Sequence, residues 1–402
     1  MKTTTFRAFS AGVSLLTLGV AMPGFVSPAM AQHNGSRQTG TTNLYTVPGT
    51  YDPTPDQPSG DVSPDVNGNP GPAGDPDAAN FARVTCADEA TCALPGAIWQ
   101  TGATPTGEVV NEILVGPGAF LTIQAFASGA GSGASAQITT DAIRLIGTAP
   151  TVSNTVNNEG TINVRVLADD LGAGGLGSRA VLNTGIEQDA NGEDSATNQI
   201  INAGDLNIDV TARDVSTDGL ANASASITSF GILQAASATV GYGVASAMFS
   251  NDGTMDIVAA ATAVGNTANA DALIDQGILQ QATATAGYGD AIVGLENDGD
   301  LNILASASAF ADAGRADAAA SITGDVIEQA ANASTDEGVA TVSLTNNGTL
   351  NIGAVAFATG ADGAGADAFV SEQPFEQSAD GTDASVELTN NLGIEVLADA
   401  RA

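Results

Sequence analysis

The sequence predicts an all-β protein: a parallel β-helix (β-solenoid) of about 46-residue repeats, preceded by a disordered linker rich in Pro, Gly and Asp. Two observations predict this fold. Two short motifs recur along the chain at matching spacings, and the residues around them alternate between apolar and polar over long stretches. A unit of this kind cannot bury its own apolar face, so it is stabilised by stacking on neighbouring units.

The first motif is an Asn-x-Gly turn followed by alternating residues. It occurs as NEGTINVRV, NAGDLNIDV, NDGTMDIVA, NDGDLNILA and NNGTLNIGA, with spacings of 44, 49, 46 and 49 residues between the leading asparagines. A sixth copy, NNLGIEVLA, has Leu392 in place of the glycine, and a degenerate copy begins near Leu121. The leading asparagines are Asn158, Asn202, Asn251, Asn297, Asn346 and Asn390.

The second motif ends in glutamine and lies about half a repeat away from the first. It reads GIEQ, GILQ, GILQ, VIEQ and PFEQ, with spacings of 46, 46, 49 and 48 residues. Because two independent series follow one period, they mark the same repeat. The glutamines are Gln188, Gln234, Gln280, Gln329 and Gln377.

The alternation around these motifs indicates strands. From Leu344 to Ala358, every second residue is apolar or small or is the motif Asn or Gly, with mostly polar residues between them, and the stretch from Leu295 to Ala309 behaves alike. Period two is the signature of a strand with one buried face, whereas a helix needs a period of 3.6. A repeat can then be one wide coil or two narrow ones. A β-propeller shares this repeat length but carries more aromatic residues per blade.

Stacked coils place equivalent residues above one another. We therefore expect the asparagines and the glutamines to form inward-facing amide ladders with about 4.8 Å between rungs. A buried amide needs hydrogen-bond partners, and the neighbouring rung supplies them.

The N-terminal third differs in composition. Eleven of the 15 prolines lie between Pro48 and Pro117, which predicts a disordered acidic linker over residues 32–117 and a solenoid over residues 118–402. Residues 1–31 have the features of a signal peptide: Lys2 and Arg7, the apolar run AGVSLLTLGVAM, and the small-x-small site that ends at Ala31. The run is too short to span a membrane, so we expect no transmembrane segment in the mature chain.

Export also bears on the cysteines. Cys86 and Cys92 have five residues between them, within CADEATC. In an oxidising compartment such a pair is expected to form a small local disulfide inside the linker.

The charge balance excludes several functions. The chain has 45 Asp and Glu against 10 Lys and Arg, and its formal net charge of -35 repels nucleic-acid phosphates. One His and one Lys leave few residues for acid–base, nucleophilic or metal chemistry. We therefore expect no nucleic-acid partner, no catalytic residue, no metal ligand and no cofactor.

Carboxylates are the chemical groups that remain. Asp169-Asp170 is the only Asp-Asp pair and is the first place to look for a polysaccharide-cleaving enzyme. Asp205, Asp252 and Asp298 follow the motif asparagines and suit turn geometry and solvation, with weak surface binding of calcium as the alternative. Tyr242 and Tyr288, in equivalent Gly-Tyr-Gly turns, either pack the turn or form an exposed ladder for sugar stacking.

The copies LTNNGTLNI and LENDGDLNI resemble the β-helical passenger regions of bacterial autotransporters and repeat-containing surface adhesins. The resemblance covers residues 118–402 and implies export, followed by display at the bacterial cell surface or release outside it. The membrane barrel that ends such proteins is not present, so we expect a chain truncated at its C-terminus, or else a protein secreted without its own barrel.

The resemblance implies a non-enzymatic adhesin or structural passenger. Its partners would be components of cell surfaces or of the extracellular matrix, carbohydrate among them, or further copies of itself. Two alternatives remain: a carbohydrate-active enzyme on a β-helix scaffold, and a self-assembling subunit of an extracellular matrix or surface layer.

Overall fold

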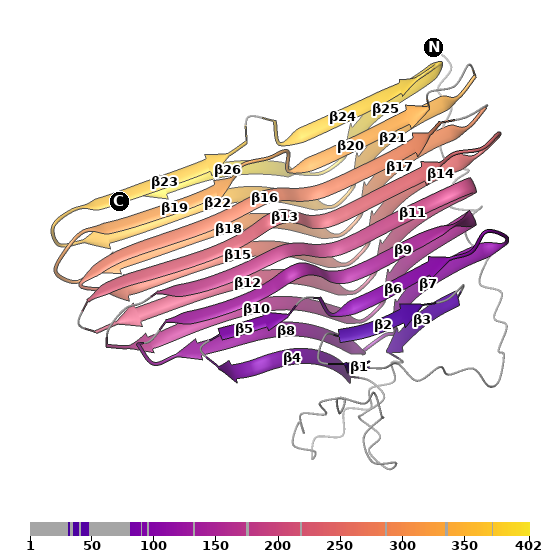
Figure 1. The fold of residues 1–402 in the computed structure, drawn as a ribbon. Coiled ribbons are helices and arrows are strands. Elements are labelled where there is room, and N and C mark those ends of the chain that lie inside the picture. Colours follow the sequence, from indigo (N-terminus) through magenta and orange to yellow (C-terminus); the bar gives the residue numbers. More distant parts are fainter. Residues whose placement is uncertain are drawn as a thin grey trace.

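The computed structural model describes residues 31–32, 35–39, 42–47, 81–89, 91–94, 96–131, 133–173, 177–217, 219–285, 288–333, 337–371 and 373–402. These residues form a parallel β-helix whose coils stack along one axis, from the indigo end to the yellow end of the chain (Figure 1). Within the described ranges, the strand pairings are parallel except for the short β1–β2 pairing. The predicted fold class is confirmed.

The strands belong to two sheets. The 8-stranded sheet contains β4 (Phe81–Glu89), β8 (Phe120–Gly129), β10 (Thr161–Gly172), β12 (Asp205–Ser216), β15 (Thr254–Gly265), β18 (Asp300–Ala311), β22 (Thr349–Gly360) and β26 (Ile394–Arg401). The 18-stranded sheet contains β1 (Ala31–Gln32), β2 (Gly35–Thr39), β3 (Thr42–Val47), β5 (Thr91–Leu94), β6 (Ile98–Ala103), β7 (Glu108–Val115), β9 (Ala134–Asn158), β11 (Ser178–Asn202), β13 (Leu220–Ala238), β14 (Val244–Asn251), β16 (Thr267–Ala284), β17 (Asp290–Asn297), β19 (Ala316–Ile322), β20 (Ile327–Ala333), β21 (Val339–Asn346), β23 (Ala364–Val370), β24 (Phe375–Gly381) and β25 (Asp383–Asn390).

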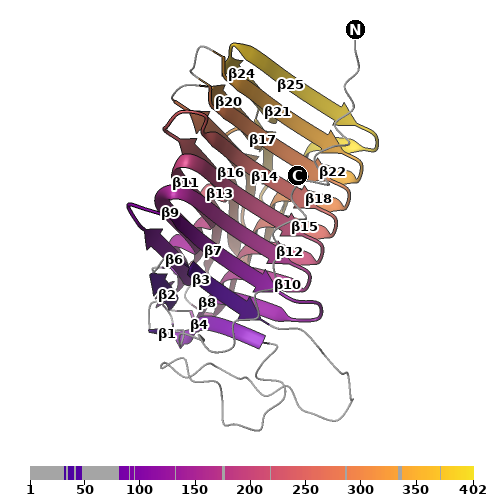
Figure 2. The ribbon, with the colours of Figure 1, turned by 90° about the vertical axis from the view of Figure 1, so that its right-hand side faces the viewer.

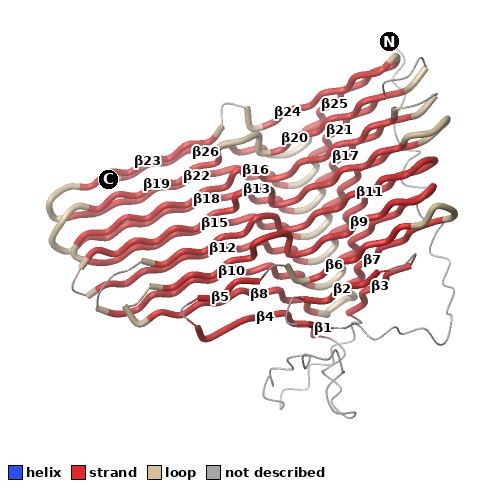
Figure 3. The backbone as a smooth tube through the Cα atoms, viewed as in Figure 1, coloured by secondary structure: helices blue, strands red, loops and turns tan. Residues whose placement is uncertain are grey.

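One repeat forms one wide coil. The chain runs through β18, β19, β20 and β21 and then enters β22, which pairs directly with β18 in parallel register. Asn297 accordingly pairs with Asn346, the equivalent residue of the next repeat. The interruptions of the strands differ between coils: β9 and β11 run through 25 residues each, whereas the corresponding course is divided between β13 and β14 and, later, between β19, β20 and β21, as the red and tan segments of Figure 3 show. The alternative of two narrow coils per repeat is ruled out.

Each coil has two arms that meet at a bend (Figures 1 and 2). We call the part of the coil that β18 and β19 form, together with the equivalent parts of the other coils, the first arm. The part that β20 and β21 form, with its equivalents, is the second arm. The first arm is filled by Leu, Ile, Val and Ala side chains, with a few larger ones such as Phe249 at the junction. Within the second arm lies a separate cluster of buried apolar side chains that consists of Ala and Val alone, which lets the two layers approach closely there. Alternation of buried and solvent-facing residues along each strand produces both cores.

The coil stack starts before residue 118, inside the range that the sequence analysis assigned to the linker. β6 and β7 pair with β9 in parallel register, and Val109, Ile113 and Val115 are 0% exposed. Pro105 and Pro117 lie in the turns that end β6 and β7, where proline needs no ladder hydrogen bond. These two prolines therefore mark turns between strands.

Other expectations for the N-terminal region stay untested. Residues 1–30 and 48–80, which include nearly all of the expected signal peptide and much of the expected linker, lie outside the described residues. Cys86 and Cys92 lie in β4 and β5, but their side chains are also outside the description. The disulfide therefore stays a prediction.

Candidate functional site

The motif asparagines form a continuous ladder where the second arm meets the first. The Nδ2 atom of each donates to Oδ1 of the next, at 2.7 Å for Asn158, Asn202, Asn251 and Asn297 and at 2.8 Å for Asn346, which donates to Asn390. The second N–H of each amide donates to a backbone carbonyl just past the turn of the next coil, such as that of Thr349. The ladder joins six repeats through Asn158, Asn202, Asn251, Asn297, Asn346 and Asn390.

The glutamines form a second ladder on the facing layer. Gln280 Nε2 donates to Gln234 Oε1 at 2.8 Å and to the Gly294 carbonyl at 3.0 Å. The first bond joins consecutive coils, whereas the second crosses the second arm from β16 to β17. The same pair of bonds recurs at Gln234 and Gln329, and Gln188 makes the cross-arm bond at 3.0 Å. The predicted Asn and Gln stacks are thus present.

The two ladders run in opposite directions. Each asparagine donates toward the C-terminal end of the stack, whereas each glutamine donates toward the N-terminal end, as Gln377 does to Gln329 at 2.8 Å. Amide dipoles in the two columns therefore oppose each other along the axis. Both columns are dry, with exposed fractions of 0% at Asn297 and Gln280.

A third ladder was missed from the sequence. Asn111 Nδ2 donates to Asn154 Oδ1 at 2.7 Å, and Asn154 Nδ2 donates to Asn198 Oδ1 at 2.9 Å. Asn198 then ends the ladder on the backbone carbonyls of Gln188 and Ala235. Its signal was present, because Asn154 and Asn198 each stand four residues before a motif asparagine.

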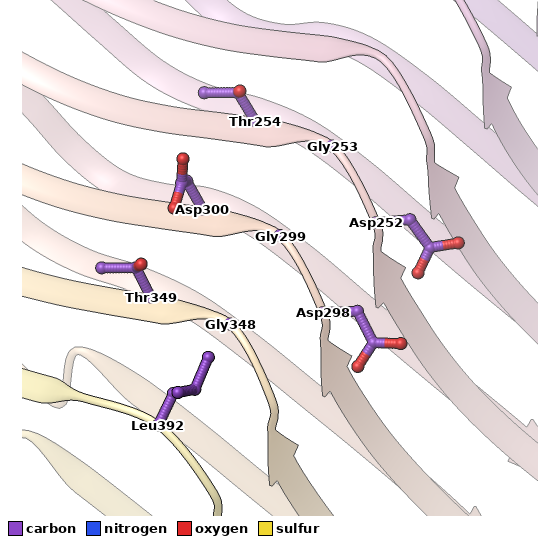
Figure 4. Close-up of a pocket in the computed structure, with 9 residues that line it drawn as sticks. All are labelled: Asp252, Gly253, Thr254, Asp298, Gly299, Asp300, Gly348, Thr349 and Leu392. Atoms are coloured by element: carbon purple, nitrogen blue, oxygen red, sulfur yellow. The ribbon is translucent and has the colours of Figure 1, made fainter.

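The motif glycines form the floor of a shallow groove along the stack (Figure 4). A Cβ atom on Gly299 would lie 2.0 Å from the carbonyl oxygen of Gly253, and Gly348 is equally crowded by Gly299. Only glycine fits while the coils keep this spacing. The groove has a volume of about 470 Å³ and is lined by Asp252, Gly253, Thr254, Asp298, Gly299, Asp300, Gly348, Thr349 and Leu392.

The groove is acidic. Figure 4 shows Asp252 and Asp298 on one side of the glycine line, with Asp300 on the other. Burial, followed by the charges of Asp298 and Asp252, raises the pKa of Glu296. Asn347 Nδ2 donates to Asp298 Oδ1 at 2.7 Å, so this aspartate is held by the turn of the next coil. In the described part of the chain, no group of three or more His, Cys, Asp or Glu side chains is placed to hold a metal ion.

The Asp169-Asp170 pair has structural contacts. Asp170 accepts hydrogen bonds from the backbone N–H groups of Gly131 at 2.7 Å and Gly133 at 2.9 Å, so both of its oxygens hold the loop of the preceding coil. Asp169 lies 4.0 Å from Arg213 of the next coil. The structure thus gives Asp170 a loop-holding contact and pairs Asp169 with an arginine on the outer sheet face.

A different carboxyl pair stands out at the bend, and sequence reasoning missed it. Asp141 and Glu187 hydrogen-bond each other from adjacent coils, and Arg144 Nε lies 3.6 Å from Asp141 Oδ2 and 3.1 Å from Glu187 Oε2. Burial raises the pKa of Glu187 to about 8, helped by the hydrogen bond and charge of Asp141 and opposed by Arg144. Two carboxyls in direct contact are too close for a glycosidase, which needs a separation of about 5 Å or more.

The turn tyrosines are solvent-facing. Tyr242 and Tyr288 stack with ring centroids 5.1 Å apart and an interplanar angle of 13°, and they are 77% and 47% exposed. A second aromatic pair, Phe310 and Phe357, lies on the outer face of the 8-stranded sheet with centroids 5.5 Å apart and each ring 38% exposed. The tyrosine rings carry hydroxyl groups beside their apolar faces and suit contact with a polar partner such as a sugar, whereas the phenylalanine rings lack such groups.

The described residues contain no helix with the length and apolarity needed to cross a membrane. Comparisons of the chain with protein-family models, with curated proteins and with solved structures each find no match. The sites above therefore rest on the residues and contacts of this chain alone.

Proposed function

We propose that the chain is a non-enzymatic, secreted or cell-surface β-solenoid that acts as an adhesin or structural passenger of a bacterial surface. The observation that carries this proposal is the use of inward polar groups for joining coils. The side-chain amides of Asn297 and Gln280 donate hydrogen bonds to the neighbouring coil and to backbone carbonyls, and those of the equivalent residues do the same. Such a stack is a stiff rod whose outward faces are free to meet a partner.

The outward faces suit a passive binding role. Along β21, Thr341, Ser343 and Thr345 alternate with the buried Val342 and Leu344, so hydroxyls line this face. Hydroxyl groups and exposed aromatic rings bind carbohydrates and protein surfaces without catalysing a reaction. The signal peptide expected at residues 1–31 and the autotransporter-like repeats favour delivery to the cell surface.

A glycan and matrix-protein array probed with the purified chain tests the adhesive role. We expect retention on at least one carbohydrate or matrix component, and weaker retention for the double variant Tyr242→Ala/Tyr288→Ala. The matched control is Phe310→Ala/Phe357→Ala, which removes the other exposed aromatic pair and should bind normally. A chain that binds no component, or that releases sugar fragments from one, would contradict a passive adhesive role.

A further inference from the structure

Outward-pointing side chains at the bend connect consecutive coils. Gln276 Nε2 donates to Glu328 Oε2 of the next coil at 3.1 Å. Asp141 and Glu187 make the same kind of contact lower in the stack, between β9 and β11. Glu187 and Glu328 each directly precede a ladder glutamine, so the two contacts occupy equivalent places in different coils.

A third contact repeats the arrangement near the C-terminal end. Asp325 hydrogen-bonds Glu376, which pairs in register with Glu328 and precedes Gln377. At three places along the stack, the same position of one coil thus binds a second position of the next coil, and the coils between them carry Thr184 and Phe230 at the first position. Two of these contacts join a carboxyl to a carboxyl, and one joins an amide to a carboxyl.

The carboxyl–carboxyl contacts and the amide–carboxyl contact differ in whether they need a bound proton. A carboxylate has only acceptor atoms, so two carboxyls hydrogen-bond each other only when one of them is protonated. An amide donates to a carboxylate without any proton uptake. The Gln276–Glu328 contact therefore needs no bound proton, whereas the Asp141–Glu187 contact needs one.

We propose that the bend contains a proton-dependent latch between coils, in which the Asp141–Glu187 pair holds neighbouring coils together while it keeps one proton. The Gln276–Glu328 contact is the proton-independent equivalent within the same molecule.

The surroundings of Glu187 favour retention of the proton. Glu187 has 15% of its side chain exposed and Asp141 has 8%. The charged groups that face the pair are Arg144 from the same coil as Asp141 and Asp189 from β11. β6 contributes the neutral Trp99, whose Nε1 donates to the Asp141 carbonyl at 3.4 Å, and β13 places the apolar Leu233 next to Glu187.

The upper pair has a more open setting. The charge of Asp325, followed by its hydrogen bond, raises the pKa of Glu376, and the charge of Glu328 adds to this. No cation contacts the pair among the described residues. Since Glu376 is exposed to solvent, the latch is assigned to the Asp141–Glu187 pair alone.

The pKa of Glu187 sets the pH range over which the latch weakens. Its pKa rises from 4.5 to about 8 in the folded chain, so the closed latch keeps its proton where an opened bend would lose it. The latch contributes fully below pH 4.5, weakens as the pH rises, and contributes nothing further above about pH 8. The opening equilibrium can increase by up to about tenfold per pH unit within this window.

Hydrogen exchange of the full chain, read by mass spectrometry and corrected for intrinsic exchange rates, tests the latch. Between about pH 5 and about pH 8, protection of the β9 and β11 segments at the bend should fall at least about tenfold in the wild type. Glu187→Gln recreates the amide–carboxylate contact of Gln276–Glu328, so its protection at the bend should stay flat with pH. The β16 and β20 segments around Gln276 serve as the internal control.

Two results would overturn the latch: wild-type protection at the bend that is independent of pH, and a pH dependence that Glu187→Gln leaves unchanged. If Glu187→Gln fails to fold, Asp141→Asn makes the same exchange from the other side. An independent readout is the infrared band of a protonated carboxyl in wild-type protein near neutral pH. Its absence from the wild type would also refute the proposal.

Discussion

Replacing Asn297 by leucine tests the ladder at its centre. Asn297 is 0% exposed, accepts a hydrogen bond from Asn251 Nδ2 at 2.7 Å, and donates to Asn346 Oδ1 at 2.7 Å and to the Thr349 carbonyl at 2.9 Å. A leucine side chain offers none of these bonds. The amide of one coil and two oxygens of the next would lose partners in a dry interior.

The cost follows from the groups left unsatisfied. A buried polar group without a partner costs about 1–3 kcal/mol, and the change affects three such groups. Asn251 keeps one other bond, to the Asp300 carbonyl at 3.1 Å, which limits its share. We therefore expect a loss of about 3–6 kcal/mol in the free energy of unfolding.

The neighbouring Asp298 supplies the matched control. Its side chain is exposed and accepts one surface hydrogen bond from Asn347 at 2.7 Å. Asp298→Leu should change the free energy of unfolding by less than about 1 kcal/mol, as surface substitutions usually do. Urea unfolding followed by circular dichroism compares the two variants on one scale.

The comparison has a clear failing outcome. Equal effects of the two substitutions, or a larger effect of Asp298→Leu, would mean that the alternation of inward and outward residues is assigned to the wrong phase. A loss below about 1 kcal/mol for Asn297→Leu would mean that the ladder does not stabilise the stack.

Three further predictions concern other parts of the coil. Gly299→Ala should lower the free energy of unfolding in urea by about 2–4 kcal/mol, because the new Cβ would lie 2.0 Å from a backbone oxygen. The control Gly393→Ala, whose Cβ would have nothing within 4 Å, should leave it nearly unchanged, and equal effects would refute the close approach. Asp170→Ala should speed amide exchange in the loop it holds by about tenfold or more, and unchanged exchange would contradict that contact. The free energy of unfolding should decline as the pH rises from 4.5 to about 8, because the raised pKa of Glu187 makes the folded chain hold a proton that the unfolded chain releases; a decline equally steep in Glu187→Gln would exclude Glu187 as its source.

The repeats carried enough information to predict the stack. Asn297 and Gln280 belong to series with one period, and alternation fixes which of their neighbours face inward. Both properties are local or periodic, so they can be read without knowing how the chain turns. The coil number per repeat could not be read, because it depends on whether a Gly-rich segment ends a strand or bends it.

Contacts between coils were harder to anticipate. Asp141 and Glu187 meet only because each repeat forms a single coil, which places the two residues on adjacent rungs at the bend. Neither residue stands out in its own segment of the sequence. Composition also concealed β6 and β7, since Pro105 and Pro117 occupy their turns and make this stretch resemble a linker. Turn prolines and linker prolines have the same effect on composition, and only strand pairing separates them.

A single distance tests the central claim that each repeat is one coil of a parallel stack. Leu167 and Val355 occupy the same outward column, four rungs apart, through the successive partners Thr211, Ala260 and Ser306. Spin labels on Leu167→Cys and Val355→Cys, with both native cysteines replaced by serine, report this span by double electron–electron resonance. The stack predicts about 19 Å between the labelled backbones, from four rungs of about 4.8 Å. A separation near 38 Å, as two coils per repeat would give, or a broad distribution without a defined distance would contradict it.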